Sequence, residues 1–358
     1  MERARALILA YGWNATAYQT LNRGIDHWFA SDGDAMVGYV VQAGVRIVAG
    51  APVCAESRLP AVIDEFERDA AGAGHRVCYF GAGERLESIR RARAPVATVL
   101  LGAQPVWHPA RLAETIMARA TLRAQLARAR HKGVSLSEWP STLDAPSHQA
   151  LALVLDQWLA TRGLPPLHFL IEPHTLDRLL DRRLFVAQRA GQPVAFLVAS
   201  PVPGRHGWLV EQSVRGRAAP NGTSESLLAY AATVLAADGA QYLTLGLSPL
   251  SRRAPVTAPP VSPWLRLTLA WVRAHGRRFY NFDGLDAYKA KFRPEHWEPV
   301  YALSNEPHTS PRTLYAIAAA FCAGSPVRTI AHALGDAVHQ ELASGRDRQI
   351  HGQQPAAL

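Results

Sequence analysis

Two stretches of the chain repeat one pattern of hydrophobic and polar positions. Residues 37–53 read VGYVVQAGVRIVAGAPV, and residues 184–202 read LFVAQRAGQPVAFLVASPV. Each stretch has an apolar run rich in β-branched residues, an Ala-Gly pair, a second apolar run and a proline. Apolar runs separated by a two-residue turn that contains glycine are typical of β-hairpins. We therefore predict one hairpin in each half of the chain.

A helix and a further strand are predicted after each hairpin. In the first half, residues 59–73 have helical periodicity and precede an apolar run at 77–80. In the second half, the corresponding segments are 224–238 and 242–245. In both halves a glycine separates the helix from the strand. Two such units predict an α+β fold made of tandem duplicated domains, each with a mixed, mainly antiparallel sheet flanked by helices. The order of elements resembles the core of the GNAT acyltransferase fold.

The chain is expected to divide near residues 139–147, a polar stretch that contains two prolines. We predict a first GNAT-like domain at 1–140 and a catalytic GNAT-like domain at 141–309. Residues 310–358 are predicted to form one or two helices and a polar tail. Between residues 246 and 263, turn-forming residues and prolines predict a loop that precedes a helix at 264–275.

A basic helix is predicted at residues 112–132, as the last part of the first domain. At helical spacing, three of its arginines share one stripe, with further cations close by. The residues concerned are Arg119, Arg123, Arg128, Arg130 and Lys132. They could form a solvated face of a connecting helix, or they could contact the phosphates of RNA or of anionic lipids.

Composition and charge narrow the class of protein. About half of the 358 residues are apolar (48%) and the net charge is +9, which favours a folded chain with a polyanionic partner. The three cysteines are too few and too scattered for a disulfide framework or a zinc site, so we predict no metal. No apolar run is long enough to span a bilayer or to act as a signal peptide. We therefore expect a cytoplasmic protein without a transmembrane segment.

One candidate site lies after the strand that carries Glu211 and Arg215. It leads into a Pro-Asn-Gly turn at Asn221 and Gly222, and a helix follows directly. Amide groups at a helix N-terminus can hold an anion or a developing oxyanion. Alternatively, Asn221 and Gly222 could form a tight turn without a binding role, and Glu211 and Arg215 could form an ion pair on the surface.

The densest group of candidate residues lies at 280–301, where aromatic, acidic and lysine residues cluster. The chain has only three lysines, and two of them, Lys289 and Lys291, stand in this segment together with Asp283. Because an ammonium is a compact donor whose pKa shifts readily, lysine is not interchangeable with the arginine used elsewhere in this chain. Further substrate-binding candidates are Tyr280 and Tyr288 in this segment and Ser248 at the preceding strand end.

Together these segments resemble the C-terminal catalytic domain of phosphatidylglycerol lysyltransferases and alanyltransferases, a dual-GNAT domain also known as DUF2156. The resemblance covers about residues 5 to 305, including Tyr11-Gly-Trp-Asn, Asp32-Gly33 and Gly50-Ala-Pro52 in the first half. One departure is Ala51, where the family often has an acid. The matching positions of the second half are Glu211, Arg215, Pro220 to Gly222, Leu245-Gly246, Pro249-Leu250, Phe282, Gly284-Leu285, Lys289, Lys291-Phe292, Pro294, Trp297, Pro299 and Tyr301.

The resemblance implies transfer of an aminoacyl group from aminoacyl-tRNA to the hydroxyl of phosphatidylglycerol or a related lipid, without a cofactor. It implies that Glu211 or Asp283 reads the α-amino group, and that both lysines hold phosphate or developing charge. Arg215 would fix the ribose-phosphate end, and the turn at Asn221 and Gly222 would supply donors. The partners implied are aminoacyl-tRNA and an anionic membrane lipid, which the protein would reach by peripheral contact with the inner face of the membrane.

Three other functions remain open at this stage. A Fem-type peptidyltransferase would use the same donor but a cell-wall precursor as acceptor. An acyl-CoA-dependent N-acetyltransferase would need a glycine-rich pyrophosphate loop, which the residues from Arg215 to Gly222 imitate only poorly. A module that binds tRNA or membranes without catalysis would not need the clustered acids and lysines.

Overall fold

The computed structural model describes residues 1–92, 96–161, 167–257, 261–275 and 281–322. Within these residues, twelve strands form one mixed sheet in the order β1-β2-β3-β4-β12-β5-β10-β9-β8-β7-β6, with β11 paired to β5. The strands are β1 Asp26–Phe29, β2 Met36–Gln42, β3 Val45–Ala49, β4 Arg76–Ala82, β5 Ala97–Trp107, β6 Val134–Trp139, β7 Arg183–Arg189, β8 Gln192–Val202, β9 Gly207–Arg215, β10 Tyr242–Thr244, β11 Ser248–Pro249 and β12 His296–Ser304.

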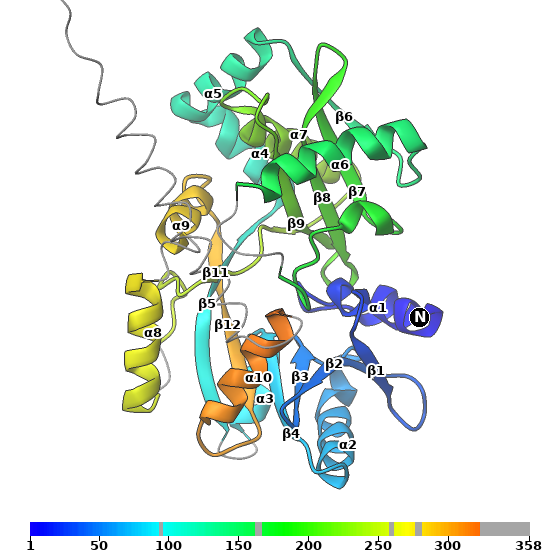
Figure 1. The fold of residues 1–358 in the computed structure, drawn as a ribbon, viewed down its shortest axis with the longest axis vertical. Helices are drawn as coiled ribbons and strands as arrows, with labels where there is room; N and C mark the ends of the chain where they lie inside the picture. The colour runs from blue at the N-terminus through cyan, green and yellow to red at the C-terminus, as the bar shows by residue number, and fades with distance from the viewer. Residues whose placement is uncertain (93–95, 162–166, 258–260, 276–280, 323–358) are drawn as a thin grey trace, which may run out of the picture.

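Helices cover both faces of this sheet (Figure 1). Four short 3₁₀ turns, η1 to η4, lie at Tyr18–Leu21, Glu56–Arg58, Thr175–Arg178 and Pro203–Arg205. The α-helices are α1 Glu2–Tyr11, α2 Leu59–Gly72, α3 Glu84–Arg91, α4 Pro109–Ala118, α5 Ala120–His131, α6 Ala145–Leu159, α7 Thr223–Ala237, α8 Pro263–His275, α9 Phe282–Ala290 and α10 Pro311–Cys322.

The fold has two halves, each built around one parallel strand pair. In the first half β3 and β4 are parallel and α2 connects them; in the second half β9 and β10 are parallel and α7 connects them. All other strand pairs are antiparallel. The predicted α+β fold with two GNAT-like units and flanking helices is therefore confirmed.

Both predicted hairpins are present, at β2–β3 and at β7–β8. Their Ala-Gly turns have positive φ at both residues, 49° and 71° at Ala43-Gly44 and 51° and 77° at Ala190-Gly191. Such angles characterise the two-residue turns that match the twist of a hairpin. The two hairpins are not equivalent in the topology, because β3 leads directly into α2, whereas β9 follows β8 before α7 begins. The sequence repeat thus pairs β2–β3 with β7–β8, whereas in the structural repeat β2–β3 corresponds to β8–β9. The two repeats differ by one strand.

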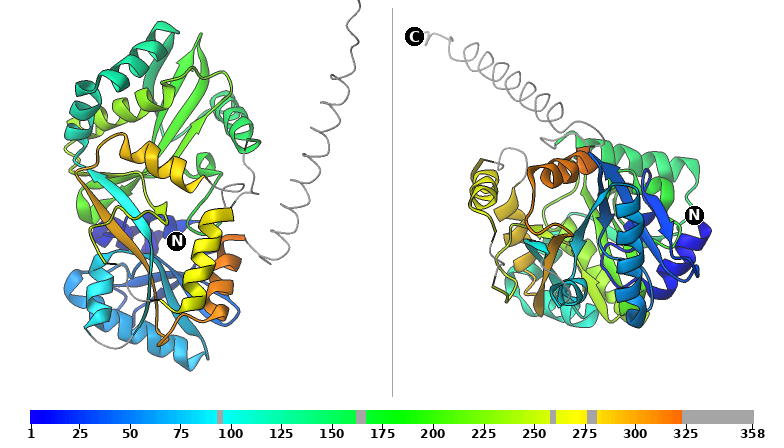
Figure 2. Two further views of the ribbon diagram at one scale, coloured as in Figure 1. Left: turned by 90° about the vertical axis from the view of Figure 1, so that its left-hand side faces the viewer. Right: turned by 90° about the horizontal axis from the view of Figure 1, so that it is seen from below.

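The two halves exchange elements along the chain. Strand β12, from the C-terminal part, lies between β4 and β5, and its whole length pairs with β5. Conversely, α4 and α5 pack against α7 of the second half, and β6 pairs with β7. Strands from before and after residue 140 therefore pair with one another in both halves of the sheet. The domain boundary at residue 140 remains a prediction from sequence. Figure 2 shows β5 and β12 running side by side from one half into the other.

The single basic helix predicted at 112–132 is wrong, because the structure has two helices. Arg119 is extended between α4 and α5, with φ −92° and ψ 118°. The Arg123 guanidinium donates to the carbonyls of Met117 and Ala118, both at 2.8 Å, and so caps the end of α4. An alanine-rich sequence has no residue that signals this break, since the contacts that favour it are side chain to backbone.

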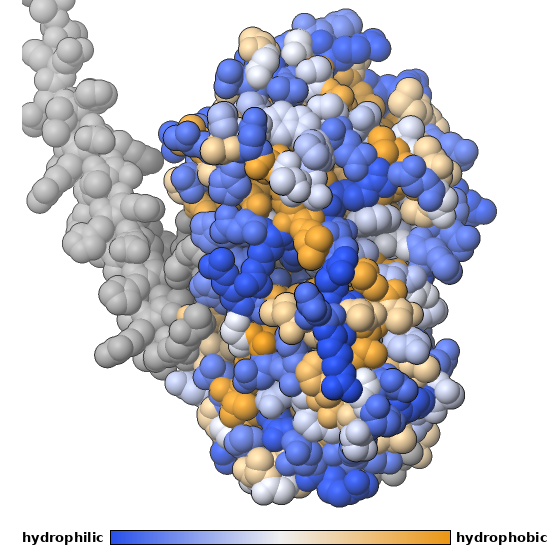
Figure 3. Space-filling view, turned by 90° about the vertical axis from the view of Figure 1, so that its right-hand side faces the viewer, coloured by the Kyte–Doolittle hydropathy of each residue, from blue (hydrophilic) through white to orange (hydrophobic). Residues whose placement is uncertain are grey.

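Apolar clusters fill each half separately. One cluster joins α4, α5 and α7 to β7–β9, with Phe292 and Trp107 buried in it. Another joins α2 to β3 and β4, and a third places α8 and α10 on the opposite face of the first half. Figure 3 shows the face that carries α1, where hydrophilic side chains cover much of both halves and apolar ones gather mainly near the waist between them.

Candidate active site at the end of the second parallel strand pair

The two lysines of the Lys-x-Lys segment lie at the end of helix α9 and point to different partners. Lys289 is in the last turn of α9, and its Nζ donates to the carbonyls of Gly246 and Leu247 at 2.8 and 2.9 Å. These carbonyls follow β10, where the parallel pair β9–β10 ends. Lys289 thus lies at the end of a parallel strand pair, the position where open α/β sheets commonly bind ligands.

Burial changes the acid–base behaviour of Lys289. Only 4% of the residue is exposed. Desolvation, which disfavours the charged ammonium, lowers the pKa of Lys289 to about 7, and the nearby Asp286 carboxylate opposes this shift. An amine with a pKa near neutrality can exchange a proton with a substrate at physiological pH.

Lys291, just beyond the last residue of α9, forms an ion pair with Glu225 in the first turn of α7. Its Nζ also lies 4.1 Å from the centre of the Tyr288 ring and 5.0 Å from that of Phe292. Phe292 is fully buried, and its carbonyl accepts a hydrogen bond from the Trp107 indole at 3.1 Å. The core therefore fixes the end of α9, and Lys291 is held as a cation close to the N-terminus of α7.

Arg215, Asn221 and Gly222 join this group at the same helix N-terminus. The Arg215 Nη2 donates to Asn221 Oδ1 at 2.9 Å and to the Ala219 carbonyl at 3.0 Å. These bonds connect the end of β9 to the loop that leads into α7. Gly222 caps α7 with φ 95°. The structure thus brings together Lys289, Lys291, Arg215, Asn221 and Gly222, which the sequence places up to 76 residues apart.

Gly222 also has a packing role, and this leads to a prediction. A Cβ at this position would lie 2.0 Å from the Gln125 carbonyl oxygen of α5, in a backbone conformation that L residues rarely adopt. Gly222→Ala is therefore expected to lower the free energy of unfolding by at least about 2 kcal/mol. Chemical denaturation measures this, with Gly239→Ala as a control at positive φ, where nothing lies near the added methyl. Equal losses in the two variants would contradict the close approach to α5.

Ser248 and Tyr288 lie beside the two lysines. Ser248, in β11, is fully buried, and its Oγ has no hydrogen-bond partner among the described residues. Burial raises the pKa of the Tyr288 phenol above its ordinary value, and Glu225 adds to the shift. Tyr280, also predicted to bind substrate, lies outside the residues that the structure describes.

Asp283 lies in the first turn of α9, at the other end of the helix from Lys289. It pairs with Arg273 of α8 at 3.1 Å, and Arg273 also donates to the Leu250 carbonyl at 2.9 Å. In the middle of α9, Asp286 pairs with Arg253 at 2.7 Å. These two ion pairs connect α9 to α8 and to the loop that follows β11.

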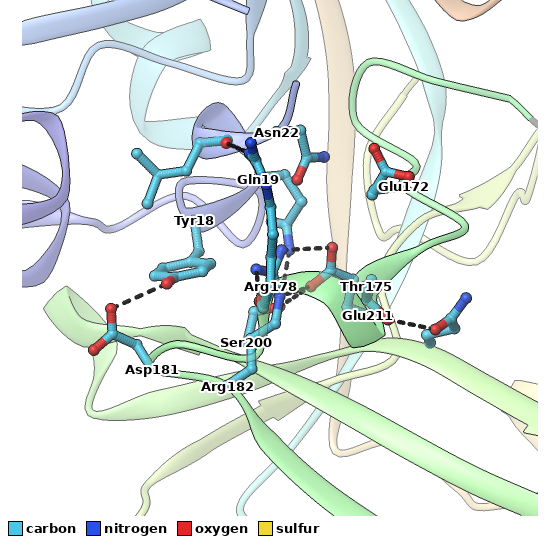
Figure 4. Close-up of polar contacts among 12 residues, drawn as sticks. Tyr18, Gln19, Asn22, Glu172, Thr175, Arg178, Asp181, Arg182, Ser200 and Glu211 are labelled. Atoms are coloured by element: carbon cyan, nitrogen blue, oxygen red, sulfur yellow. Dashed lines mark hydrogen bonds and ion pairs between the residues drawn. The ribbon is translucent and has the colours of Figure 1, made fainter. Parts of the chain in front are cut away.

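Glu211 makes its contacts in a different network, which Figure 4 shows. Its carboxylate accepts two hydrogen bonds from Arg182, at 2.8 and 3.1 Å, and one from the Ser200 hydroxyl. Both charged side chains are only 5% exposed. Because both carboxylate oxygens already have donors, the geometry gives Glu211 the features of a buried structural ion pair.

The Glu211 network joins the two halves of the molecule. The Arg182 guanidinium lies 4.8 Å from the centre of the Tyr18 ring in η1. The Tyr18 hydroxyl donates to the Leu180 carbonyl, and Gln19 donates to Ser200 at 3.0 Å. On the rim, Arg5 of α1 binds the Asp181 carboxylate at 2.5 Å. First-half residues thus contact second-half residues directly around Glu211.

The predicted basic surface is divided between two roles. Arg119 donates to the Lys291 carbonyl, and Arg123 caps α4, so both guanidinium groups bind backbone oxygens. Arg128, Arg130 and Lys132 are exposed near the end of α5. The contact of Arg119 places α5 directly beside the lysine segment.

Two groups were given no functional role from sequence. They are Glu225 and Arg182. Glu225 is 66 residues from Lys291, and Arg182 is 29 residues from Glu211. No periodicity or motif links residues at such distances, because the fold alone sets their pairing.

The described residues contain no cluster of three or more His, Cys, Asp or Glu side chains that could hold a metal ion. In the same residues, no helix has the length and apolar character required to cross a bilayer. The candidate site contains a buried amine, cationic side chains and a helix N-terminus, and such groups can position an ester and stabilise an oxyanion.

Comparison with known proteins gives a family match over most of the chain. Residues 5–304 match the family model described as phosphatidylglycerol lysyltransferase, C-terminal. A phosphatidylglycerol lysyltransferase from Bacillus subtilis (strain 168) is 24% identical over 323 residues, 88% of this chain. The lysylphosphatidylglycerol biosynthesis bifunctional protein LysX from Mycobacterium sp. (strain JLS) is 25% identical over 324 residues, 86% of this chain. The matched regions make up 36% and 29% of those relatives, so the chain spans about a third of their length.

A solved structure agrees in fold with most of the chain. It is the C-terminal domain (DUF2156) of a protein from Agrobacterium fabrum described as a candidate lysylphosphatidylglycerol synthetase. The similarity has a TM-score of 0.74 at 25% identity and covers 89% of this chain and 96% of that one.

Proposed function

Because the chain belongs to the family of phosphatidylglycerol lysyltransferase C-terminal domains, we propose that it transfers an aminoacyl group from aminoacyl-tRNA to a lipid hydroxyl. The acceptor we propose is phosphatidylglycerol or a related lipid. The observation that best supports this reaction is Lys289, a buried amine at the strand end with a pKa of about 7.

In the proposed reaction, Lys289 acts as the general base. A neutral amine has two N–H groups and one lone pair, and the carbonyls of Gly246 and Leu247 accept both N–H groups. The lone pair then faces away from these carbonyls and can take the proton of the lipid hydroxyl as its oxygen attacks the ester carbonyl. The bond between this carbonyl and the tRNA ribose oxygen breaks, and the Lys289 ammonium returns the proton to that oxygen.

The neighbouring cations fit supporting roles. Lys291, paired with Glu225, and Arg215, fixed by Asn221, are suited to hold a phosphate or the developing oxyanion at the N-terminus of α7. This assigns the proton transfer to Lys289 and the fixed charge to Lys291. For the α-amino group of the amino acid, Glu211 is disfavoured, because Arg182 and Ser200 already occupy its carboxylate.

The rate of transfer should depend on pH in a way that follows from Lys289. Lys289 must be neutral to accept a proton, so kcat/KM is expected to rise as pH increases through about 7 and then to level off. The measurement is a pH profile of single-turnover transfer from a charged tRNA. Lys291→Met should lower the rate and keep this rising limb. If the profile is flat between pH 6 and 8, Lys289 is not the base.

The proposed donor also needs a surface for tRNA. The exposed Arg128, Arg130 and Lys132 are suited to contact its backbone, at the far end of the helix whose start is held next to Lys291 by Arg119. Such contacts release counterions, so tRNA affinity should fall steeply with salt concentration.

The function is tested by incubating the protein with a mixture of charged tRNAs and vesicles that contain phosphatidylglycerol. Mass spectrometry of the lipids should detect a species that has gained an aminoacyl mass. Parallel reactions replace the vesicles with a cell-wall precursor, or the charged tRNAs with acetyl-CoA. Product in either of these reactions, and none with lipid, would overturn the proposal.

A further inference from the structure

Helix α8 carries apolar side chains on two opposite faces, which a helix at the edge of a water-soluble fold does not need. Leu265 is buried and Leu269 partly buried against the third apolar cluster. On the other side, Leu267 is 70% exposed and Trp264 is 38% exposed. Leu267 follows Trp264 by three positions, so the two side chains share one face of the helix. Among the large hydrophobic residues described, none is more exposed than Leu267.

The sequence before and through α8 carries only basic charges. From Gly239 to Phe282 the sequence contains no Asp or Glu. The described arginines of this stretch are Arg252, Arg253, Arg266 and Arg273, and Arg266 and Arg252 are exposed. An exposed strip of Trp and Leu on a helix whose own charged residues are all cationic is typical of helices that lie in the headgroup region of an anionic bilayer.

The helix is also directly linked to the candidate active site. Arg273 of α8 binds Asp283 of α9, and Arg253, in the loop before α8, binds Asp286 of α9. Helix α9 carries Lys289. In Figures 1 and 2, α8 lies at the outer edge of the molecule, next to α9. A surface that contacts α8 therefore lies on the same side as the elements that hold the lysines.

We propose that α8, with the loop at Arg252 and Arg253, is a membrane-docking surface that inserts Trp264 and Leu267 among the headgroups of an anionic bilayer. This inference rests on the proposed lipid acceptor and adds the surface by which the protein reaches it. RNA, the other polyanion considered, would be attracted by the arginines but offers nothing to cover Leu267. The apolar strip therefore favours a bilayer.

The test compares vesicle binding of two double variants. Trp264→Ser/Leu267→Ser removes the strip, and Leu153→Ser/Leu180→Ser removes two residues that are 57% and 61% exposed elsewhere. With vesicles of equal parts phosphatidylglycerol and phosphatidylcholine, the first variant should partition at least about tenfold more weakly than wild type. The control should bind as wild type. Arg266→Gln should weaken binding to these vesicles and lessen its dependence on salt.

Two further measurements distinguish an effect on membrane docking from an effect on aminoacyl transfer. With dioctanoyl phosphatidylglycerol below its micellar concentration, Trp264→Ser/Leu267→Ser should retain the wild-type rate, since no bilayer must be reached. Binding of tRNA by the same variant should also be unchanged. If this variant binds vesicles as tightly as wild type, or loses tRNA binding and vesicle binding equally, α8 is not the membrane-docking surface. If wild-type protein binds vesicles through α8 yet aminoacylates no lipid, the proposed function fails and the docking surface stands.

Discussion

Replacing Lys289 with methionine is expected to lower the rate of aminoacyl transfer by about 10²–10⁴-fold, the usual contribution of a general base. Methionine keeps most of the volume of the buried stem but has no group that can accept a proton. The substitution also leaves the carbonyls of Gly246 and Leu247 without their donor, which should cost about 1–3 kcal/mol of stability. Single-turnover transfer with a saturating charged tRNA measures the first effect, and thermal unfolding measures the second.

The third lysine of the chain offers a matched control. Lys132→Met removes an exposed ammonium beyond the end of α5 and should leave the chemical step unchanged at saturating tRNA. Lys289→Arg should be as inactive as Lys289→Met, because a guanidinium does not lose its proton in proteins. Transfer by folded Lys289→Met at a tenth of the wild-type rate or faster would rule out Lys289 as the base.

Breaking the ion pair between Arg182 and Glu211 is expected to lower the free energy of unfolding by about 3–5 kcal/mol. Both side chains are 5% exposed, so either single substitution leaves a buried charge without its counterion. The variants Arg182→Met and Glu211→Leu should each show this loss in chemical denaturation. The double variant should recover much of it, because two apolar side chains of similar size can pack in place of the pair.

The same variants decide between two roles for Glu211. If the pair is structural, the double variant should be folded and should transfer the aminoacyl group at nearly the wild-type rate. If Glu211 reads the substrate, as the family resemblance implies, the folded double variant should be inactive. If each single variant lowers the free energy of unfolding by less than about 1 kcal/mol, Arg182 and Glu211 do not form a tight buried pair.

The elements of the fold could be predicted from sequence where local chemistry decides them. The Ala-Gly pairs at 43–44 and 190–191 impose hairpins because their backbone angles close a two-residue turn. Helices α2 and α7 follow from periodicity and end before Gly74 and Gly239, both at positive φ. The break between α4 and α5 was missed, because its support comes from the Arg123 guanidinium and not from a helix-breaking residue.

The assembly of the elements could not be predicted in the same way. The repeat in sequence matched β2–β3 to β7–β8, whereas the topology relates the two units through β3–α2–β4 and β9–α7–β10. Nothing local in residues 296–304 indicates that β12 lies between β4 and β5. Strand order depends on which apolar faces can be buried together, and this is a property of the whole chain.

The sequence by itself determined where the candidate site would be sought, because lysine is rare in this chain and the motif around Lys289 and Lys291 is dense. Only the tertiary structure gave the two lysines different environments. Residues two apart at the end of a helix face different directions, so Lys289 is buried against backbone carbonyls and Lys291 meets Glu225. The pKa of an amine depends on burial and nearby charge, and the packing of residues distant in sequence sets both.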